Sequence, residues 1–142
     1  MTLGLTKNLK LQKKIIILDS DYKYSLQIAK AAMKHQIQVV ITSNLSAFML
    51  EVTKNEEQLI SLIVNNQYIS DMFERSLFGV VNNYPFIIVD SNPLTQNTIN
   101  TIPVSQLSFV NKKLGIPVLM KKILSENILP KDQQGFANVS QM

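Results

Sequence analysis

The chain has 142 residues, of which 46% are hydrophobic and 17% charged, so it can form one compact domain with a buried core. It contains no cysteine, which excludes disulfides, a thiol nucleophile and a thiolate metal site. No apolar run approaches the ~20 residues of a membrane span, and the basic N-terminus lacks the apolar stretch of a signal peptide. We therefore expect a cytoplasmic protein.

Positive charge gathers near the two ends of the chain. The formal net charge is +4; the first 14 residues hold four lysines and no acid, and residues 104–131 hold five lysines and one acid. Arg75 is the single arginine. This composition argues against a dedicated nucleic-acid reader, because such proteins use arginine forks on bases and phosphates.

Taken in chain order, five strands are expected to alternate with about five helices. Residues 15–18, Ile-Ile-Ile-Leu, cannot alternate between core and water, so they predict a strand that is covered on both faces, as in a parallel sheet. The other strands are expected at residues 37–41, 59–64, 85–89 and 105–110. Apolar residues at helical spacing predict helices at 22–35, 47–53 and 69–77, a weak helix after Pro93, and a last helix from about Gly115 to Pro130.

Glycine and proline set several of the expected boundaries. We expect Gly79 to stop the helix at 69–77, and Pro93 to lie in the first turn of the helix that follows it. Residues 1–13 are expected to be a flexible basic leader, residues 14–127 the folded domain, and residues 128–142 a flexible tail.

The alternation of strands and helices predicts an α/β fold with a doubly wound, five-stranded parallel sheet. In the flavodoxin-like strand order 2-1-3-4-5, ligands bind at the carboxyl ends of the strands. Polar residues follow those ends, and six of them are expected to converge on one edge of the sheet: Asp19, Ser20, Asn66, Asp90, Ser91 and Lys112.

These residues, in this order, resemble the receiver domain of two-component response regulators over about residues 14–126. The family has an acidic pair after its first strand, where this chain has Asp19 and Ser20. It has a phosphoacceptor aspartate after its third strand, where the best match is Asn66, or Asn65 if the register shifts by one residue. It has a Ser or Thr after the fourth strand, where this chain has Asp90 followed by Ser91.

The resemblance extends to the fifth strand. The family has an aromatic switch residue three positions before a lysine, and Phe109 and Lys112 have that spacing. A proline normally follows the lysine, and here Lys113 takes its place. The resemblance implies the receiver fold in order 2-1-3-4-5, and a partner or dimer surface on the fourth helix, fifth strand and fifth helix. On that surface lie Lys112, Lys113, Lys121 and Lys122.

The departures from the family pattern fall on its chemistry. An asparagine amide has no ionised oxygen with which to form an acyl phosphate, and Ser20 removes a second carboxylate from the expected Mg²⁺ site. We therefore expect a pseudo-receiver: no enzyme, no cofactor and no strong metal site, with Asp19 and Asp90 as the weak candidates for a cation.

Each of these residues also has a purely structural interpretation. Asp19 or Asp21 could cap the helix that begins near residue 22, and Asp90, Ser91 or Asn92 the helix after Pro93. Lys112 could pair with Asp19 or Asp90, or be solvent-exposed, and Phe109 could be a static strand residue. The lysine pairs could simply decorate a solvated face.

Three functions follow from these expectations. The leading one is a non-catalytic, phosphorylation-independent protein-interaction module in signalling or regulation, with a protein partner, an acidic one being an option, or a homodimer through the surface named above. The second is a domain that binds a small ligand or divalent cation through Asp19, Asp90 and Lys112. The third is a basic accessory protein for nucleic acid.

Overall fold

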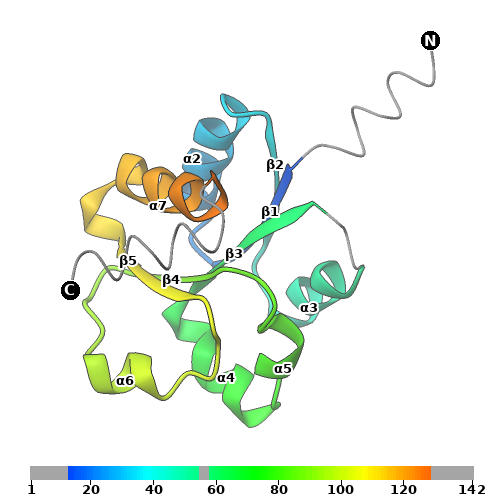
Figure 1. Ribbon diagram of the computed structural model, residues 1–142, viewed down its shortest axis with the longest axis vertical. Helices are drawn as coiled ribbons and strands as arrows, with labels where there is room; N and C mark the ends of the chain where they lie inside the picture. The colour runs from blue at the N-terminus through cyan, green and yellow to red at the C-terminus, as the bar shows by residue number, and fades with distance from the viewer. Residues whose placement is uncertain (1–12, 55–57, 129–142) are drawn as a thin grey trace.

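The computed structural model of the chain describes residues 13–54 and 58–128 (Figure 1). The leader expected at residues 1–13 and the tail expected at 128–142 lie outside these ranges, apart from Lys13, which begins the first strand, and Ile128, which ends the last helix. Within the described residues, no helix is long and apolar enough to cross a membrane.

Five parallel strands form a single sheet. The strands are β1 (Lys13–Leu18), β2 (Ile37–Thr42), β3 (Leu59–Asn65), β4 (Phe86–Asp90) and β5 (Leu107–Asn111). Their order across the sheet is β2-β1-β3-β4-β5, and every neighbouring pair is parallel. The predicted fold class and strand order are confirmed, and all five strands lie within two residues of their predicted limits.

The connections between strands are helical. They are α2 (Tyr22–Met33), α3 (Leu45–Thr53), η1 (Asn66–Tyr68), α4 (Ile69–Glu74), α5 (Phe78–Val81), α6 (Gln96–Asn100), η2 (Lys112–Leu114) and α7 (Ile116–Ile128). Helices α2 and α7 cover one face of the sheet, and α3, α4 and α5 cover the other (Figure 1). Helix α6 buries none of its residues, which agrees with the weak helix that the sequence predicts there.

The two sides of β1 belong to two hydrophobic clusters. Ile15 and Ile17 pack with α2 and α7, whereas Ile16 and Leu18 pack with the helices of the opposite face. All four side chains are fully buried. The run at residues 15–18 therefore packs against both helical layers. Burying each aliphatic side chain of this size stabilises the fold by ~1.5–3 kcal/mol.

Two predicted helix boundaries are wrong. The helix after β3 ends at Glu74, and Gly79 lies inside the separate short helix α5 instead of stopping α4. The chain turns at Ser76, whose φ is 56°, and this turn brings Phe78 back towards the sheet, where its ring lies 4.8 Å from that of Phe73 and 6.3 Å from that of Phe86.

The second wrong boundary follows β4. The helix α6 begins at Gln96, so Pro93 lies outside it and not in its first turn. Thr95 caps the helix by accepting a hydrogen bond from the backbone of Thr98. The expected caps at Asp90, Ser91 or Asn92 are therefore not used for α6. The last helix begins close to its predicted position, after Gly115, whose backbone has φ 90° and ψ 166°.

Candidate functional site

At the carboxyl ends of four strands an aspartate or asparagine, the last residue of the strand or the one after it, makes the same local hydrogen bond. In each case the side-chain Oδ1 accepts from the backbone N–H two residues later. The acceptors are Asp19, Asn65, Asp90 and Asn111, and their donor–acceptor distances are 2.9, 2.9, 3.3 and 2.9 Å. Such turns let the chain leave a strand sharply. Polar residues at this edge therefore have a structural reason to be present, independent of any chemistry.

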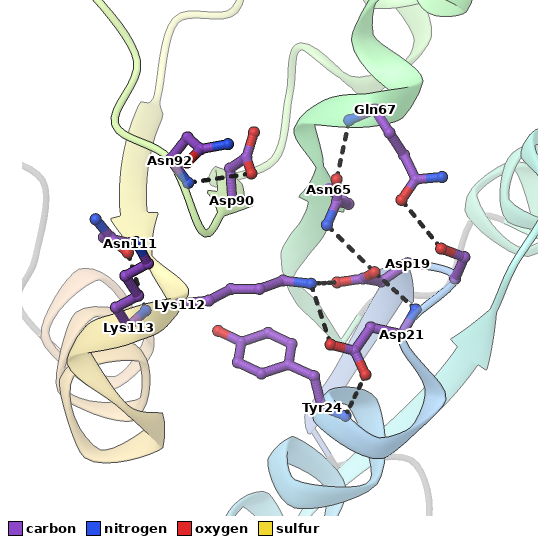
Figure 2. A network of polar contacts seen from close by, with 11 residues as sticks. Asp19, Asp21, Tyr24, Asn65, Gln67, Asp90, Asn92, Asn111, Lys112 and Lys113 are labelled. Carbon is purple, nitrogen blue, oxygen red and sulfur yellow. Dashed lines mark hydrogen bonds and ion pairs between the residues drawn. The ribbon is translucent and has the colours of Figure 1, made fainter.

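Asp19 and Lys112 form a buried ion pair at the centre of this edge (Figure 2). Lys112 Nζ lies 2.7 Å from Asp19 Oδ2, and the exposed fractions of the two side chains are 11% and 1%. The same ammonium lies 3.6 Å from Asp21 Oδ2, whose side chain is half exposed. Lys112 therefore reaches from the end of β5 across the sheet to the end of β1.

Both oxygens of the Asp19 carboxylate contact a partner, and among the described residues only Oδ1 accepts hydrogen bonds, since Oδ2 is held by the ion pair alone. Oδ2 faces the Lys112 ammonium, while Oδ1 accepts hydrogen bonds from the backbone of Asp21 at 2.9 Å and from the amide of Asn65 at 3.3 Å. A buried carboxylate is stable only when it is paired and hydrogen-bonded in this way.

Helix α2 contributes the Tyr24 ring, which packs against the Lys112 ammonium of the ion pair. Asp21 caps the helix by accepting a hydrogen bond from the backbone of Tyr24 at 3.1 Å, and this places the Tyr24 ring below the lysine. The ammonium of Lys112 lies 4.6 Å from the ring centroid, within the range of a cation–π contact. Burial, together with the negative charges of Asp19 and Asp21, holds the pKa of the Tyr24 hydroxyl well above its usual range.

The two asparagines after β3 point to different partners. Asn65 is the last residue of the strand, and its amide donates to Asp19, as described above. Asn66 begins the short helix η1, and its amide donates to Asp90 Oδ2 at 3.1 Å. The sequence favoured Asn66 at the position of the phosphoacceptor; in space, it is Asn65 that lies beside Asp19.

The other predicted site residues lie around this centre without joining the ion pair. Ser20 is exposed, and its hydroxyl donates to the side chain of Gln67 at 3.1 Å. Ser91 is also exposed, and Phe109 is half-buried on β5, where it packs against the cluster on the α3 side of the sheet. Of the three residues nominated for a cation site, Asp19 and Lys112 face each other and Asp90 bonds instead to Asn66.

Sequence reasoning missed three residues that shape the edge. Neither Tyr24 nor Gln67 nor Tyr68 was singled out by the sequence pattern. The Tyr68 hydroxyl donates to the backbone carbonyl of Ser43 at 2.7 Å, and burial raises its pKa. No pattern of spacing predicts these contacts, because each joins residues that only the folded sheet brings together.

The four lysines of the predicted partner surface lie in different environments. Lys112 is used by the ion pair with Asp19, whereas Lys113 and Lys121 are exposed and Lys122 is half-buried. Lys121 and Lys122 line a groove of about 480 Å³ between α7 and β5. Among the described residues, no group of three or more histidine or acidic side chains gathers in a way that could hold a metal ion.

Comparison with known proteins gives one clear structural likeness. No family model matches the chain, and no curated protein matches it. The fold is similar to the crystal structure of a response regulator receiver domain protein from Bacillus halodurans, with a TM-score of 0.62 over 81% of this chain and 97% of that chain, at 18% identity. The chain therefore has the fold of a receiver domain, as its sequence resemblance implied.

Proposed function

We propose that this chain is a pseudo-receiver, a domain that keeps the receiver fold, carries out no phosphoryl transfer and acts through protein contacts in signalling or regulation. The observation that carries this proposal is the Lys112–Asp19 ion pair beside Asn65. A receiver needs a carboxylate nucleophile and an oxygen-lined site for a divalent cation at this edge.

Neither requirement is supported by the residues at the edge. We assign Asn65 to the phosphoacceptor position, because it ends β3 and lies against Asp19, and its amide cannot act as a carboxylate nucleophile. The ammonium of Lys112 already neutralises Asp19 and lies close to Asp21, so a cation would have to displace it. Mg²⁺ is dehydrated reluctantly, which makes that exchange unfavourable.

Incubation of the full-length chain with Mg²⁺ and acetyl phosphate tests the proposal. We expect the intact mass to stay unchanged and the melting temperature to be the same with and without millimolar Mg²⁺. A stoichiometric, acid-labile gain of about 80 Da, the mass of one phosphoryl group, would overturn the proposal.

A matched pair of variants tests which asparagine occupies the phosphoacceptor position. Ser20→Asp combined with Asn65→Asp places new carboxylates next to Asp19, so we expect Mg²⁺ to raise the melting temperature of this double variant. Ser20→Asp combined with Asn66→Asp places the second carboxylate beside Asp90 instead, and we expect a smaller response. The reverse order of the two responses would assign the position to Asn66.

A further inference from the structure

The outer side of β2 is an open edge of the sheet. Within the described residues, β2 stands first in the strand order and pairs only with β1. Its sequence, Ile-Gln-Val-Val-Ile-Thr at residues 37–42, contains no charge and no proline, and its register with β1 is unbroken. Natural proteins usually protect an edge strand with lysine, proline or a bulge, because a regular edge can pair with another strand. Residues 37–42 have none of these features, so β2 is suited to strand addition.

The backbone groups of alternate β2 residues point towards β1 and away from it. The carbonyl of Thr42 accepts a hydrogen bond of 3.1 Å from the backbone of Asp19, so Thr42 faces β1. Because this direction alternates along a strand, three residues of β2 direct their N–H and C=O groups outward. They are Ile37, Val39 and Ile41. These groups can bind a further strand without disturbing the pairing of β2 with β1.

The three outward residues of β2 are complementary to a second copy of themselves. An antiparallel copy of the strand centred on Val39 opposes Val39 to Val39 and Ile37 to Ile41. Each of these outward pairs exchanges two backbone hydrogen bonds, which gives about six in all. Every opposed pair is β-branched, and such residues favour neighbouring strands. Centring the pair on Val40 instead would oppose Ile37 to Ser43, which lies beyond the end of β2.

Helix α2 carries an exposed apolar stripe beside the same edge. Tyr22, Leu26 and Met33 form this stripe; they are 62%, 38% and 72% exposed and share one side of the helix. Tyr24 lies two residues from both Tyr22 and Leu26, and hence on nearly the opposite side, where it contacts Lys112 at the end of β5. Because α2 lies between α7 and β2 (Figure 1), the stripe faces away from α7, towards the β2 edge.

We propose that two copies of the chain form a dimer by antiparallel pairing of β2 with β2, centred on Val39. The twofold axis runs perpendicular to the sheet, because opposed residues of an antiparallel pair point to the same face. The two five-stranded sheets then become one, with both α2 helices on the same side. Helices pack about 8–10 Å apart, or roughly two strand spacings, so the two stripes can meet across the junction.

The symmetry of β2 favours a second copy over a different partner. A twofold dimer uses the same patch on both subunits, and the three outward positions around Val39 read alike from either direction. Neither β2 nor the stripe carries a charge, so the dimer opposes no like charges at its centre. The inference goes beyond the proposed function, because this dimer uses the edge of the sheet remote from β5 and does not depend on the state of Asp19.

A single introduced thiol tests both the dimer and its register. The chain has no cysteine, so Val39→Cys and Val40→Cys each carry only one. Opposed hydrogen-bonded residues have Cα atoms ~5.5 Å apart, which suits a disulfide. In the proposed register Val40 lies diagonal to its copy at ~7–8 Å, which is too far. We expect oxidised glutathione to convert Val39→Cys into a disulfide-linked dimer and to leave Val40→Cys without one. Equal cross-linking of the two variants, or preferential cross-linking of Val40→Cys, would contradict the pairing centred on Val39.

Sedimentation of the full-length chain measures the equilibrium between monomer and dimer, and two substitutions should shift it. Val39→Pro removes an outward N–H, and proline is tolerated on edge strands. Leu26→Lys places a positive charge in each stripe, and lysine keeps the helix propensity high. Each should weaken the dimer at least ~10-fold, with folding checked by circular dichroism. Val118→Lys is the matched control, because Val118 is 42% exposed on α7 at the other end of the sheet, and it should leave the dimer unchanged.

The results that would overturn this inference differ from those that would overturn the proposed function. A chain that stays monomeric at millimolar concentration would reject the dimer, and protected amides of Val39 and Ile41 in that monomer would assign the edge to another segment of the same chain. A dimer that Val118→Lys abolishes and Val39→Pro leaves intact would use a different surface. Phosphorylation of the wild-type chain would overturn the proposed function and leave the β2 dimer standing.

Discussion

Lys112 supplies the positive charge that a cluster of carboxylates at this edge requires. Its ammonium lies 2.7 Å from Asp19 and 3.6 Å from Asp21, so the chain provides internally what a divalent cation provides in a metal site. The Tyr24 ring below the ammonium adds a contact with its negative face. Lys112 therefore gives the buried Asp19 carboxylate its counter-charge from within the chain.

Lys112→Met tests this role, because methionine keeps most of the length of the side chain and removes its charge. The substitution leaves Asp19 buried without a counter-charge, and breaking a buried pair in this way costs about 3 kcal/mol. Urea unfolding measures the loss, and Asp19→Asn in the same chain should recover part of it.

Lys113→Met provides the matched control for that experiment. Lys113 is the exposed neighbour of Lys112, so its replacement should change the free energy of unfolding by no more than about 0.5 kcal/mol. Equal effects of the two substitutions would mean that the ion pair contributes nothing to stability.

Tyr24→Phe tests the environment of the buried hydroxyl. Among the described residues, the Tyr24 hydroxyl has no hydrogen-bond partner, so phenylalanine should fold at least as stably at pH 7 and keep the contact with Lys112. Because the folded pKa of Tyr24 is raised, the unfolded chain ionises first as pH rises, and wild-type stability should fall above about pH 10.

The variant should lose less stability than the wild type over that alkaline range. Thermal melts at pH 8, 10 and 11 measure the difference. An identical alkaline slope in both proteins would show that Tyr24 is not the group responsible.

At the scale of elements, the two glycines of the described chain have opposite roles. Gly115 joins η2 to α7 with φ 90° and ψ 166°, a conformation that is essentially restricted to glycine. Gly79 lies in α5, and a Cβ atom there would meet nothing within 4 Å.

Alanine at each position should therefore act in opposite directions. Gly115→Ala should destabilise the fold by ~1–3 kcal/mol through backbone strain. A steric clash is not the cause, because the new Cβ would make only an ordinary contact with Pro117. Gly79→Ala should be neutral or stabilise it by up to ~1 kcal/mol, as alanine favours a helix. Chemical denaturation of both variants measures this contrast, and a destabilised Gly79→Ala would contradict it.

The glycines also show which elements the sequence could predict. The strands were located because runs such as residues 15–18 carry their own signal of burial on both sides. The stop assigned to Gly79 was wrong because the turn occurs at Ser76, where contacts of Phe78 with distant rings set the path of the chain. Local pattern decides the first kind of feature, and tertiary packing decides the second.

The candidate site could likewise be predicted only in part from the sequence. Its residues could be assigned to one edge, because parallel strands place their carboxyl ends together. Which asparagine would face Asp19 depends on a register of one residue, and the cation–π contact of Lys112 with Tyr24 joins β5 to α2. Neither is encoded in a local spacing.

At the scale of the whole molecule, the sheet separates two hydrophobic clusters that share its strands. Successive residues of β1 and of β3 alternate between the clusters, as Ile16 and Ile17 do. Each strand is therefore stabilised from both sides, and loss of packing on one face weakens the support for the other. A single domain of this size is expected to unfold in one cooperative step.

Ile16→Val and Ile17→Val test this coupling with the same chemical change on opposite faces. Both side chains are fully buried, so each substitution should cost ~0.5–1.5 kcal/mol and leave the denaturant dependence unchanged. Hydrogen exchange should show α2 and α3 losing protection together in each variant, whereas separate loss on the mutated face would mean that the two layers unfold independently.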